Sequence, residues 1–270
     1  MNKVLLIGCG HMGSALLDAW VDLKSYSFAV VDPFNIKVLK KKYFKKSLQI
    51  FNNIPNQSQI KKFDIIIFAI KPQVSQKVIN QYKNFEFKNN SVIGSIIAGK
   101  KINFFKKNIK NSKQIVRIMP NMPALIGQGV SCLVKNKNFN KSNEKKITDL
   151  FSKVGKTIWL KNEKQIDMAT AISGSGPGYV FTLIDAFEKA SRKIGFSTKT
   201  SRELVLSTLL GSANLMKKTN KNPTELANSV AVKGGTTEAG IKVLQKNNLN
   251  KIIHDTFLAA YKRASKLGKR

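Results

Sequence analysis

The sequence predicts an α/β domain followed by an all-α domain, and three observations lead to this fold class. The chain has 270 residues, about two domain-equivalents at roughly 100 to 200 residues each. Up to residue 160, apolar strand-like runs alternate with helical stretches, which is typical of a parallel sheet covered by helices. Beyond residue 160 only helical patterns remain. We therefore expect a parallel-sheet domain at 1–161 and a helical domain at 162–270.

Short apolar runs and the periodic stretches between them define the elements of the N-terminal domain. The predicted strands cover residues 3–7, 28–31, 48–51, 64–70, 92–97, 115–119, 130–134 and 157–160. The clearest helices between them are predicted at residues 12–23, 74–82 and 143–154. The first two strands and the helix at 12–23 make one complete βαβ unit, and later strands repeat the pattern.

The C-terminal part is predicted to contain only helices, at about residues 165–194, 198–218, 223–229, 237–246 and 250–267. Ser197 and Asn222 precede two of these helices as N-cap residues, and Pro223 suits a first helical position. Residues 204–216 are apolar nearly all round. Such a helix must be covered, either by its own domain or by a second copy of the chain.

The composition is typical of a globular protein, with 42% hydrophobic and 23% charged residues. The longest apolar run, residues 65–70, is far shorter than the roughly 18 residues that span a bilayer, and the run at 4–7 is too short for a signal peptide. The two cysteines, Cys9 and Cys132, are too few for a disulfide framework and lack metal-ligand spacing. We expect a cytoplasmic protein with no membrane segment and no metal.

The formal charge of +32, from 47 Lys and Arg against 15 Asp and Glu, suggests a nucleic-acid or anionic-membrane partner. The composition of the positive residues argues against this interpretation. Bidentate recognition of phosphates and bases favours arginine, and only five residues are arginine: Arg117, Arg192, Arg202, Arg263 and Arg270. The lysines are spread among asparagines and isoleucines, as an AT-rich coding sequence would produce. We expect no specific nucleic-acid partner, only a weak, salt-dependent attraction for anions.

A GxGxxG motif, made of Gly8, Cys9, Gly10, His11, Met12 and Gly13, stands between the first strand and the first helix. In a Rossmann-type domain the first glycine permits the tight turn and the second admits the pyrophosphate. The third lets strand and helix pack closely, with the helix N-terminus facing the phosphates. An ordinary strand-to-helix turn is the alternative. His11 is expected beside the phosphates and not as a catalyst.

Asp32 closes the second strand, 24 residues after Gly8, where a carboxylate can accept hydrogen bonds from the adenosine ribose. Such a carboxylate would repel a 2′-phosphate and thereby favour NADH. Lys37 and the general positive charge could offset that preference, so the sequence leaves NADPH or NADH open. Asp32 followed by Pro33 could also be a plain strand-ending turn.

Three later strands end in segments that would meet at the carboxyl edge of the sheet, where ligands of open α/β sheets lie. These segments cover residues 68–73, 95–99 and 117–124, and Lys71 faces the crevice in the first of them. Each segment alone is explained by a plain turn, but three such segments at one edge of the sheet predict a ligand-binding site.

Two glycine-rich segments interrupt the helical part, at residues 173–179 and 233–240. The first is explained by close helix packing or a kink at least as well as by a ligand. The second combines Gly234, Gly235, Thr236 and Thr237 just before a short helix. Free backbone N–H groups and hydroxyls there would suit a carboxylate, although a mere N-cap is the alternative. The sequence shows no Ser-His-Asp arrangement, which disfavours hydrolytic chemistry.

In order and spacing these motifs resemble those of the pyrroline-5-carboxylate reductase family. The resemblance includes the GxGxxG motif, the strand end at 69–73, the segments at 95–99 and 119–123, and the motifs at 173–177 and 234–237. The last two motifs together are specific to that family. Where the family usually has Thr and Ser, this chain has Met122 and Val232.

The resemblance implies hydride transfer from NADPH or NADH to 1-pyrroline-5-carboxylate, which makes L-proline. It assigns Gly235, Thr236 and Thr237 to the substrate, with the Thr237 hydroxyl on the ring nitrogen as the catalytic contact. It also implies that the helical domains pair between subunits, as a homodimer or an assembly of dimers. The residues that it places around the cofactor are Gly8, Cys9, Gly10, His11, Met12, Gly13, Asp32, Asn56, Ile70, Lys71 and Ala98.

A protonated imine is already an electrophile, so such an enzyme must mainly orient its two ligands. The reaction therefore needs no strong acid, which is consistent with the lack of a candidate acid in the sequence. A β-hydroxyacid dehydrogenase is the alternative, because that class also joins a Rossmann domain to helices. It uses a helix lysine as acid and base, for which Lys189 or Lys193 would be the candidate.

Overall fold

The computed structural model describes residues 1–109 and 112–268, which form two compact units. Unit 1 contains Met1–Ser175 and the chain from Ala260 onward, and unit 2 contains Gly176–Ala259. Unit 1 is an α/β unit with a Rossmann-type sheet and unit 2 is all-helical, so the predicted fold class is confirmed. The domain boundary expected after residue 161 stays a prediction.

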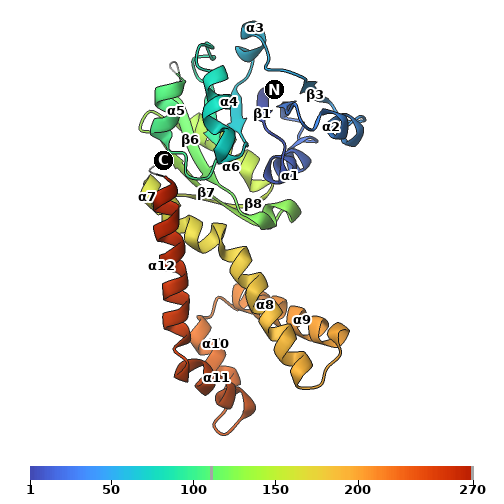
Figure 1. Cartoon of the computed structure of the whole chain (residues 1–270), viewed down its shortest axis with the longest axis vertical. Coiled ribbons are helices and arrows are strands. Elements are labelled where there is room, and N and C mark those ends of the chain that lie inside the picture. Colours follow the sequence, from blue (N-terminus) through green and yellow to red (C-terminus); the bar gives the residue numbers. More distant parts are fainter. Residues whose placement is uncertain (110–111, 269–270) are drawn as a thin grey trace. The chain divides into compact units, whose positions relative to one another are not determined.

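Unit 1 is built on an eight-stranded sheet with the strand order β3-β2-β1-β4-β5-β6-β7-β8 (Figure 1). The strands are β1 (Asn2–Ile7), β2 (Tyr26–Val31), β3 (Leu48–Phe51), β4 (Ile65–Phe68), β5 (Val92–Ser95), β6 (Gln114–Met119), β7 (Gly129–Lys135) and β8 (Gly155–Trp159). Every predicted strand is therefore present, with ends that differ by a few residues. The chain leaves β1 toward β2 on one side and later returns to β4 on the other. This reversal creates a switch point between β1 and β4.

Two strands, β7 and β8, depart from the expected parallel sheet and run opposite to the other six. β7 pairs antiparallel with β6, and β8 then pairs parallel with β7. Between β6 and β7 lies only a 3-10 segment, Met122–Ile126, with its flanking residues. A parallel crossover needs about a dozen residues or more, so this short connection forces the chain to turn back.

Helices cover both faces of the sheet. Neighbouring residues of a strand point to opposite faces, and in these strands both sets of side chains are apolar and buried. Val4 and Leu6 belong to one core, against α1 (His11–Trp20), α2 (Ile36–Lys42) and α6 (Lys141–Ser152). Leu5 and Ile7 belong to the other core. That core also contains residues of α3 (Gln57–Ile60), α4 (Ser75–Gln81), α5 (Ile102–Asn108) and α7 (Glu163–Ala169). The sheet is thus buried on both faces, and its strand ends remain as the place for a ligand.

The single helix expected at 165–194 is wrong, because the helix is interrupted. α7 ends at Ala169, a π-helical turn covers Thr170–Gly174, and α8 (Gly176–Lys193) follows. A Cβ on Gly174 would lie 2.9 Å from Met119 Cε. Close packing and a local irregularity therefore explain Gly174, which agrees with one of the two interpretations of this segment, but at Gly176 and Gly178 a Cβ would meet no non-neighbouring described atom within 4 Å.

Unit 2 consists of α8, α9 (Thr198–Thr219), α10 (Pro223–Val230), α11 (Thr236–Lys246) and the first part of α12 (Leu249–Leu267). The expected N-caps are confirmed, because Ser197 Oγ accepts from Thr200 N at 3.1 Å and Asn222 Oδ1 accepts from Glu225 N at 2.9 Å. Among residues 176–259, all of which are described, Val205 is the only buried hydrophobic side chain.

The apolar face of α9 is open to solvent within the chain. Leu204, Leu210, Leu215 and Met216 are 46%, 63%, 53% and 40% exposed. The sequence analysis expected this helix to be covered by its own domain or by a second copy of the chain, and the rest of unit 2, which is described throughout, leaves it open. Of the helices in the described part, none combines the length and the apolar character needed to cross a membrane.

Candidate dinucleotide and substrate sites

The loop between β1 and α1 is packed too tightly for side chains at two of its glycines. Gly8 has φ +92°, and a Cβ there would lie 2.7 Å from Ala69 O and 2.7 Å from Ile70 Cγ2. At Gly13 a Cβ would lie 2.4 Å from Gly8 O. Gly8 therefore provides the turn and Gly13 the close packing, the two roles that the motif predicts.

The N-terminus of α1 is open. Gly10 is the N-cap, no side chain caps it, and within the described part of the chain no non-neighbouring heavy atom lies within 4 Å of where its Cβ would be. Gly10 and His11 are exposed, and Met12 is half-buried against the core. The first N–H groups of this 10-residue helix lie at the switch point beside β4, and the helix dipole favours an anion there.

Cys9 faces inward and is not a nucleophile. Its side chain is buried, and burial, together with the Asp32 charge, raises the pKa of the thiol to about 12. The thiol is therefore protonated at neutral pH. Its backbone N–H donates a 2.7 Å hydrogen bond to Asp32 Oδ2, which joins the glycine loop to the end of β2.

Asp32 is only 6% exposed, and both carboxylate oxygens already accept hydrogen bonds. Oδ1 accepts from Phe34 N at 3.1 Å and from Asn35 N at 3.2 Å. Oδ2 accepts from Cys9 N at 2.7 Å and from Asn35 Nδ2 at 3.0 Å. The structure therefore places Asp32 beside the glycine loop as expected. Its contact with a ribose stays a prediction.

The other residues expected around the cofactor follow the carboxyl ends of several strands. Ile70 lies against Gly8, and Lys71 is exposed directly after β4. Ala98 is exposed in the loop after β5, the strand next to β4. Asn56 follows β3, two strands from β1, and caps α3 by accepting from Gln59 N at 3.0 Å. Ile70, Lys71 and Ala98 thus follow neighbouring strands, whereas Asn56 follows β3 and caps α3; the contact of each with a cofactor stays a prediction.

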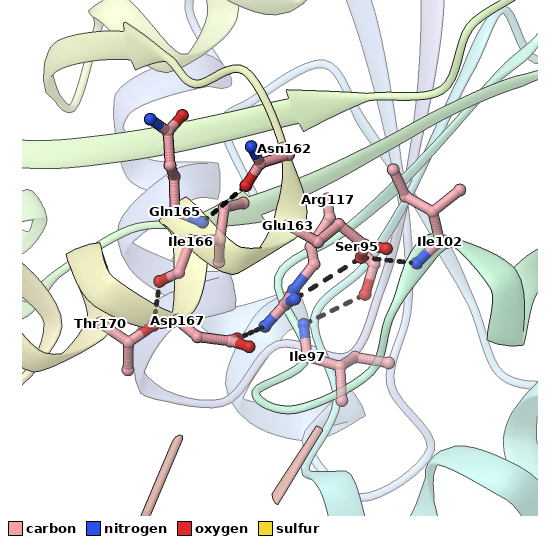
Figure 2. A network of polar contacts seen from close by, with 10 residues as sticks. All are labelled: Ser95, Ile97, Ile102, Arg117, Asn162, Glu163, Gln165, Ile166, Asp167 and Thr170. Atoms are coloured by element: carbon pink, nitrogen blue, oxygen red, sulfur yellow. Dashed lines mark hydrogen bonds and ion pairs between the residues drawn. The ribbon is translucent and has the colours of Figure 1, made fainter. Parts of the chain in front are cut away.

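A buried ionic network supports the loop that carries Ala98, and the sequence analysis missed it (Figure 2). Arg117 on β6 is 4% exposed, and its Nη2 lies 2.9 Å from Asp167 Oδ1. Its Nη1 lies 3.5 Å from Glu163 Oε1, an ion pair without a hydrogen bond, and the same oxygen accepts from Ile102 N at 2.9 Å. The network ties α7 to β6 and to the start of α5. The one signal in the sequence was an arginine within an apolar strand.

Asn121 joins two of the motifs that the sequence singled out. Its side chain is buried, Nδ2 donates to Ser173 O at 3.0 Å, and Oδ1 accepts from Val130 N at 2.7 Å. The segment after β6 therefore meets the π-helical turn within unit 1. Met122, where the resemblance would place a threonine, is 55% exposed.

Unit 2 contains a second open helix N-terminus. Gly235 is the N-cap of the 11-residue α11, without a side-chain cap, and Gly234 has φ +76°. Gly234 N donates to Glu238 Oε2 at 2.8 Å, which, together with Lys242, lowers the pKa of Glu238. Thr236 is exposed and Thr237 half-buried at the first two helical positions. The turn has free N–H groups and hydroxyls, as predicted.

The two lysines of the alternative function lie on the outside of α8. Lys189 forms a 2.6 Å ion pair with Asp185, and Lys193 is exposed at the end of the helix. Across the described residues, no cluster of three or more His, Cys, Asp or Glu side chains could hold a metal ion.

A doubly covered, mainly parallel sheet with a glycine-lined helix start at its switch point defines a Rossmann-type dinucleotide-binding protein. Comparison with known proteins agrees. The family model of NADP oxidoreductases described as coenzyme F420-dependent matches residues 3–99, and the model for pyrroline-5-carboxylate reductase dimerisation matches residues 163–267.

Whole-length relatives identify the family. The chain is 31% identical to pyrroline-5-carboxylate reductase of Synechocystis sp. over 98% of both chains. It is 32% identical to that of Aquifex aeolicus, over 98% of this chain and 97% of the relative. The structure of Plasmodium falciparum pyrroline carboxylate reductase with NADP bound matches at a TM-score of 0.83 and 30% identity, over 99% of this chain and 98% of that one. The chain belongs to the pyrroline-5-carboxylate reductase family.

Proposed function

We propose that this protein reduces 1-pyrroline-5-carboxylate to L-proline with NADPH or NADH, the last step of proline biosynthesis. The observation that carries the proposal is the open N-terminus of α1, lined by Gly8, Gly10 and Gly13. Relatives named pyrroline-5-carboxylate reductase match the chain over nearly its whole length, which supports the same function. Dinucleotide binding fits these residues, because the space beside Gly10 would be filled by a Cβ. When bound, the reduced nicotinamide supplies a hydride to C5 of the imine.

The chain's own residues bind and orient the two ligands. The first N–H groups of α1 hold the pyrophosphate, and Ile70, Lys71 and Ala98 line the cofactor at the strand ends. The Gly235 and Thr236 turn holds the substrate carboxylate on the N-terminus of α11. The Thr237 hydroxyl accepts a hydrogen bond from the protonated ring nitrogen and orients C5. Little acid catalysis is needed, since the protonated imine is already electrophilic.

A homodimer or an assembly of dimers explains the open apolar faces of unit 2. The dimerisation model matches residues 163–267, and Val205 is the one buried hydrophobic side chain among residues 176–259, each of them described. An 84-residue unit with so small a core needs a second copy to cover it. The cytoplasm remains the expected location, because Cys9 and Cys132 are both unpaired and buried.

A spectrophotometric assay tests the reaction directly. Adding pyrroline-5-carboxylate to the full chain with NADPH or NADH is expected to cause oxidation of the cofactor, followed as a loss of absorbance at about 340 nm. About one equivalent of cofactor should be oxidised per equivalent of substrate. β-Hydroxyacid substrates with oxidised cofactor are expected to give no signal. Activity only with the hydroxyacids would instead support the alternative dehydrogenase, in which Lys189 or Lys193 is the acid and base.

Thr237 provides the sharpest test of the assigned roles. Thr237→Ala is expected to lower kcat by roughly tenfold or more, about 1.4 kcal/mol of transition-state stabilisation, with little change in cofactor affinity. Thr237→Ser keeps the hydroxyl and is the matched control, expected to retain most of the turnover. Unchanged turnover in the alanine variant would remove Thr237 from the mechanism.

A further inference from the structure

We propose that Asp32 is a positioning residue for the glycine loop and not the group that selects the cofactor. Selection is instead made by Lys37, which favours the 2′-phosphate of NADPH over NADH. This inference rests on the proposed function, since it concerns which reduced nicotinamide binds to the α1 loop.

The carboxylate of Asp32 has no free acceptor position. An ionised carboxylate has about four lone-pair positions, two on each oxygen. Oδ1 accepts from Phe34 N and Asn35 N, and Oδ2 accepts from Cys9 N and Asn35 Nδ2, at distances of 2.7 to 3.2 Å. A ribose hydroxyl could bind only by displacing one of these donors. Asp32 is 6% exposed and the bond from Cys9 N is buried, so that N–H would be left without a partner if a hydroxyl displaced it; the bonds from Phe34 and Asn35 are part-buried.

These bonds give the carboxylate a different role. The bond from Cys9 N fixes the middle of the glycine loop, one residue before the open N-cap Gly10. The bonds from Phe34 and Asn35 fix the turn that leads from β2 into α2. Asp32 therefore affects the pyrophosphate through the shape of the loop. That effect is the same for both nicotinamide cofactors.

The surroundings of the same turn are positive. Between residues 33 and 63 the sequence contains no Asp or Glu. Lys37 lies exposed in the first turn of α2, five residues after Asp32, and among the described residues no carboxylate pairs with it. Farther along, Lys42 and Lys46 are neutralised by Asp18 and Asp22, at 2.7 and 2.6 Å. Lys37 is thus an unpaired cation next to the segment where the adenosine ribose is expected, and a lysine there attracts a 2′-phosphate.

Direct binding to the full chain tests the proposal without relying on turnover. The affinities for NADPH and NADH are measured by titrating the fluorescence of each reduced cofactor. We expect the unmodified chain to bind NADPH at least about fivefold more tightly. Lys37→Ala should lower the affinity for NADPH by roughly tenfold and the affinity for NADH by less than about twofold. Lys83→Ala is the charge-matched control. It removes an exposed lysine just after the C-terminal end of α4, where the chain leads to the amino end of β5 and away from the carboxyl ends of the strands, and should change neither affinity.

Asp32→Asn separates the two roles of the carboxylate. If Asp32 is a positioning residue, the substitution lowers the affinities for both cofactors by a similar factor. The ratio of the two affinities then stays within about threefold of that of the unmodified chain. If Asp32 faced the ribose, the substitution would relieve the repulsion of the 2′-phosphate and raise the ratio by roughly tenfold toward NADPH. That shift would overturn the proposal, as would an unchanged ratio in Lys37→Ala.

A second measurement needs no variant and is therefore independent of folding. The probe is the NADH analogue that lacks the 2′-hydroxyl of the adenosine ribose. We expect the unmodified chain to bind it within about threefold of NADH, whereas a tenfold loss would show that the protein holds that hydroxyl, as a ribose contact of Asp32 requires, and would overturn the proposal. If the chain bound neither NADPH nor NADH, the proposed function would fail as well. Binding of both in the wrong ratio would overturn this inference alone.

Discussion

Two glycines of the α1 loop, Gly10 and Gly13, are glycine for different physical reasons. A Cβ at Gly13 would meet the backbone oxygen of Gly8 at 2.4 Å, so the loop and the helix could not keep their packing. A Cβ at Gly10, with φ −73°, would meet no non-neighbouring atom of the described chain. Gly13 therefore serves the fold, and Gly10 serves the space for a ligand.

This difference predicts opposite outcomes for the same substitution. Gly13→Ala is expected to lower the free energy of unfolding by about 1 to 3 kcal/mol, because backbone atoms must move apart. Gly10→Ala should change the free energy of unfolding by less than about 0.5 kcal/mol, yet lower the affinity for NADPH by roughly tenfold. Urea denaturation and cofactor titration measure the two quantities. Equal cofactor affinity for Gly10→Ala and the unmodified chain would place the pyrophosphate elsewhere.

At the scale of elements, the buried network around Arg117 joins β6 to α7. Arg117 and Asp167 are 4% and 5% exposed, and their 2.9 Å contact compensates two charges that have lost water. Removing one partner of such a pair leaves the other uncompensated. Because Glu163 also accepts Ile102 N, the network sets where the loop after β5 ends and α5 begins.

Asp167→Asn is therefore expected to lower the free energy of unfolding by about 3 kcal/mol, measured by urea denaturation. Asp185→Asn is the matched control, since Asp185 pairs with Lys189 at 2.6 Å on the exposed surface of α8. An exposed pair of this kind contributes about 0.5 kcal/mol or less. Similar losses in both variants would mean that the Arg117 network is no more than a surface ion pair.

The positive charge is a property of the whole molecule. With +32 spread along the chain and few arginines, the field attracts polyanions without a specific contact. We expect duplex or single-stranded DNA to be retained only at low salt and released by about 200 mM, as followed by fluorescence anisotropy. Micromolar or tighter binding above that concentration would instead favour a specific nucleic-acid partner.

Much of the fold could be predicted because local patterns carry it. All eight strands lie where apolar runs occur, and the N-caps Ser197 and Asn222 lie where hydroxyl and amide side chains precede helices. The reversed direction of β7 and β8 was missed, because it depends on the length of the β6–β7 connection and not on the residues of these strands. A kink was one of two interpretations of residues 173–179, but the π-helical turn at Thr170–Gly174 could not be predicted for a similar reason. Gly174 there accommodates Met119, which is 55 residues away in sequence.

The sequence by itself determined the class of the protein, because the GxGxxG spacing, the strand pattern and the diglycine-threonine turn are local patterns that can be recognised without the tertiary structure. Only the tertiary structure decided which polar side chains are free to meet a ligand. Asp32 was predicted as a ribose acceptor from its place after β2, and Arg117 only as the first residue of the strand-end segment 117–124, without its ion pairs. Burial and hydrogen-bond partners at distant positions, Cys9 for one and Asp167 for the other, occupy these charges. Such long-range pairing leaves no trace in a local pattern.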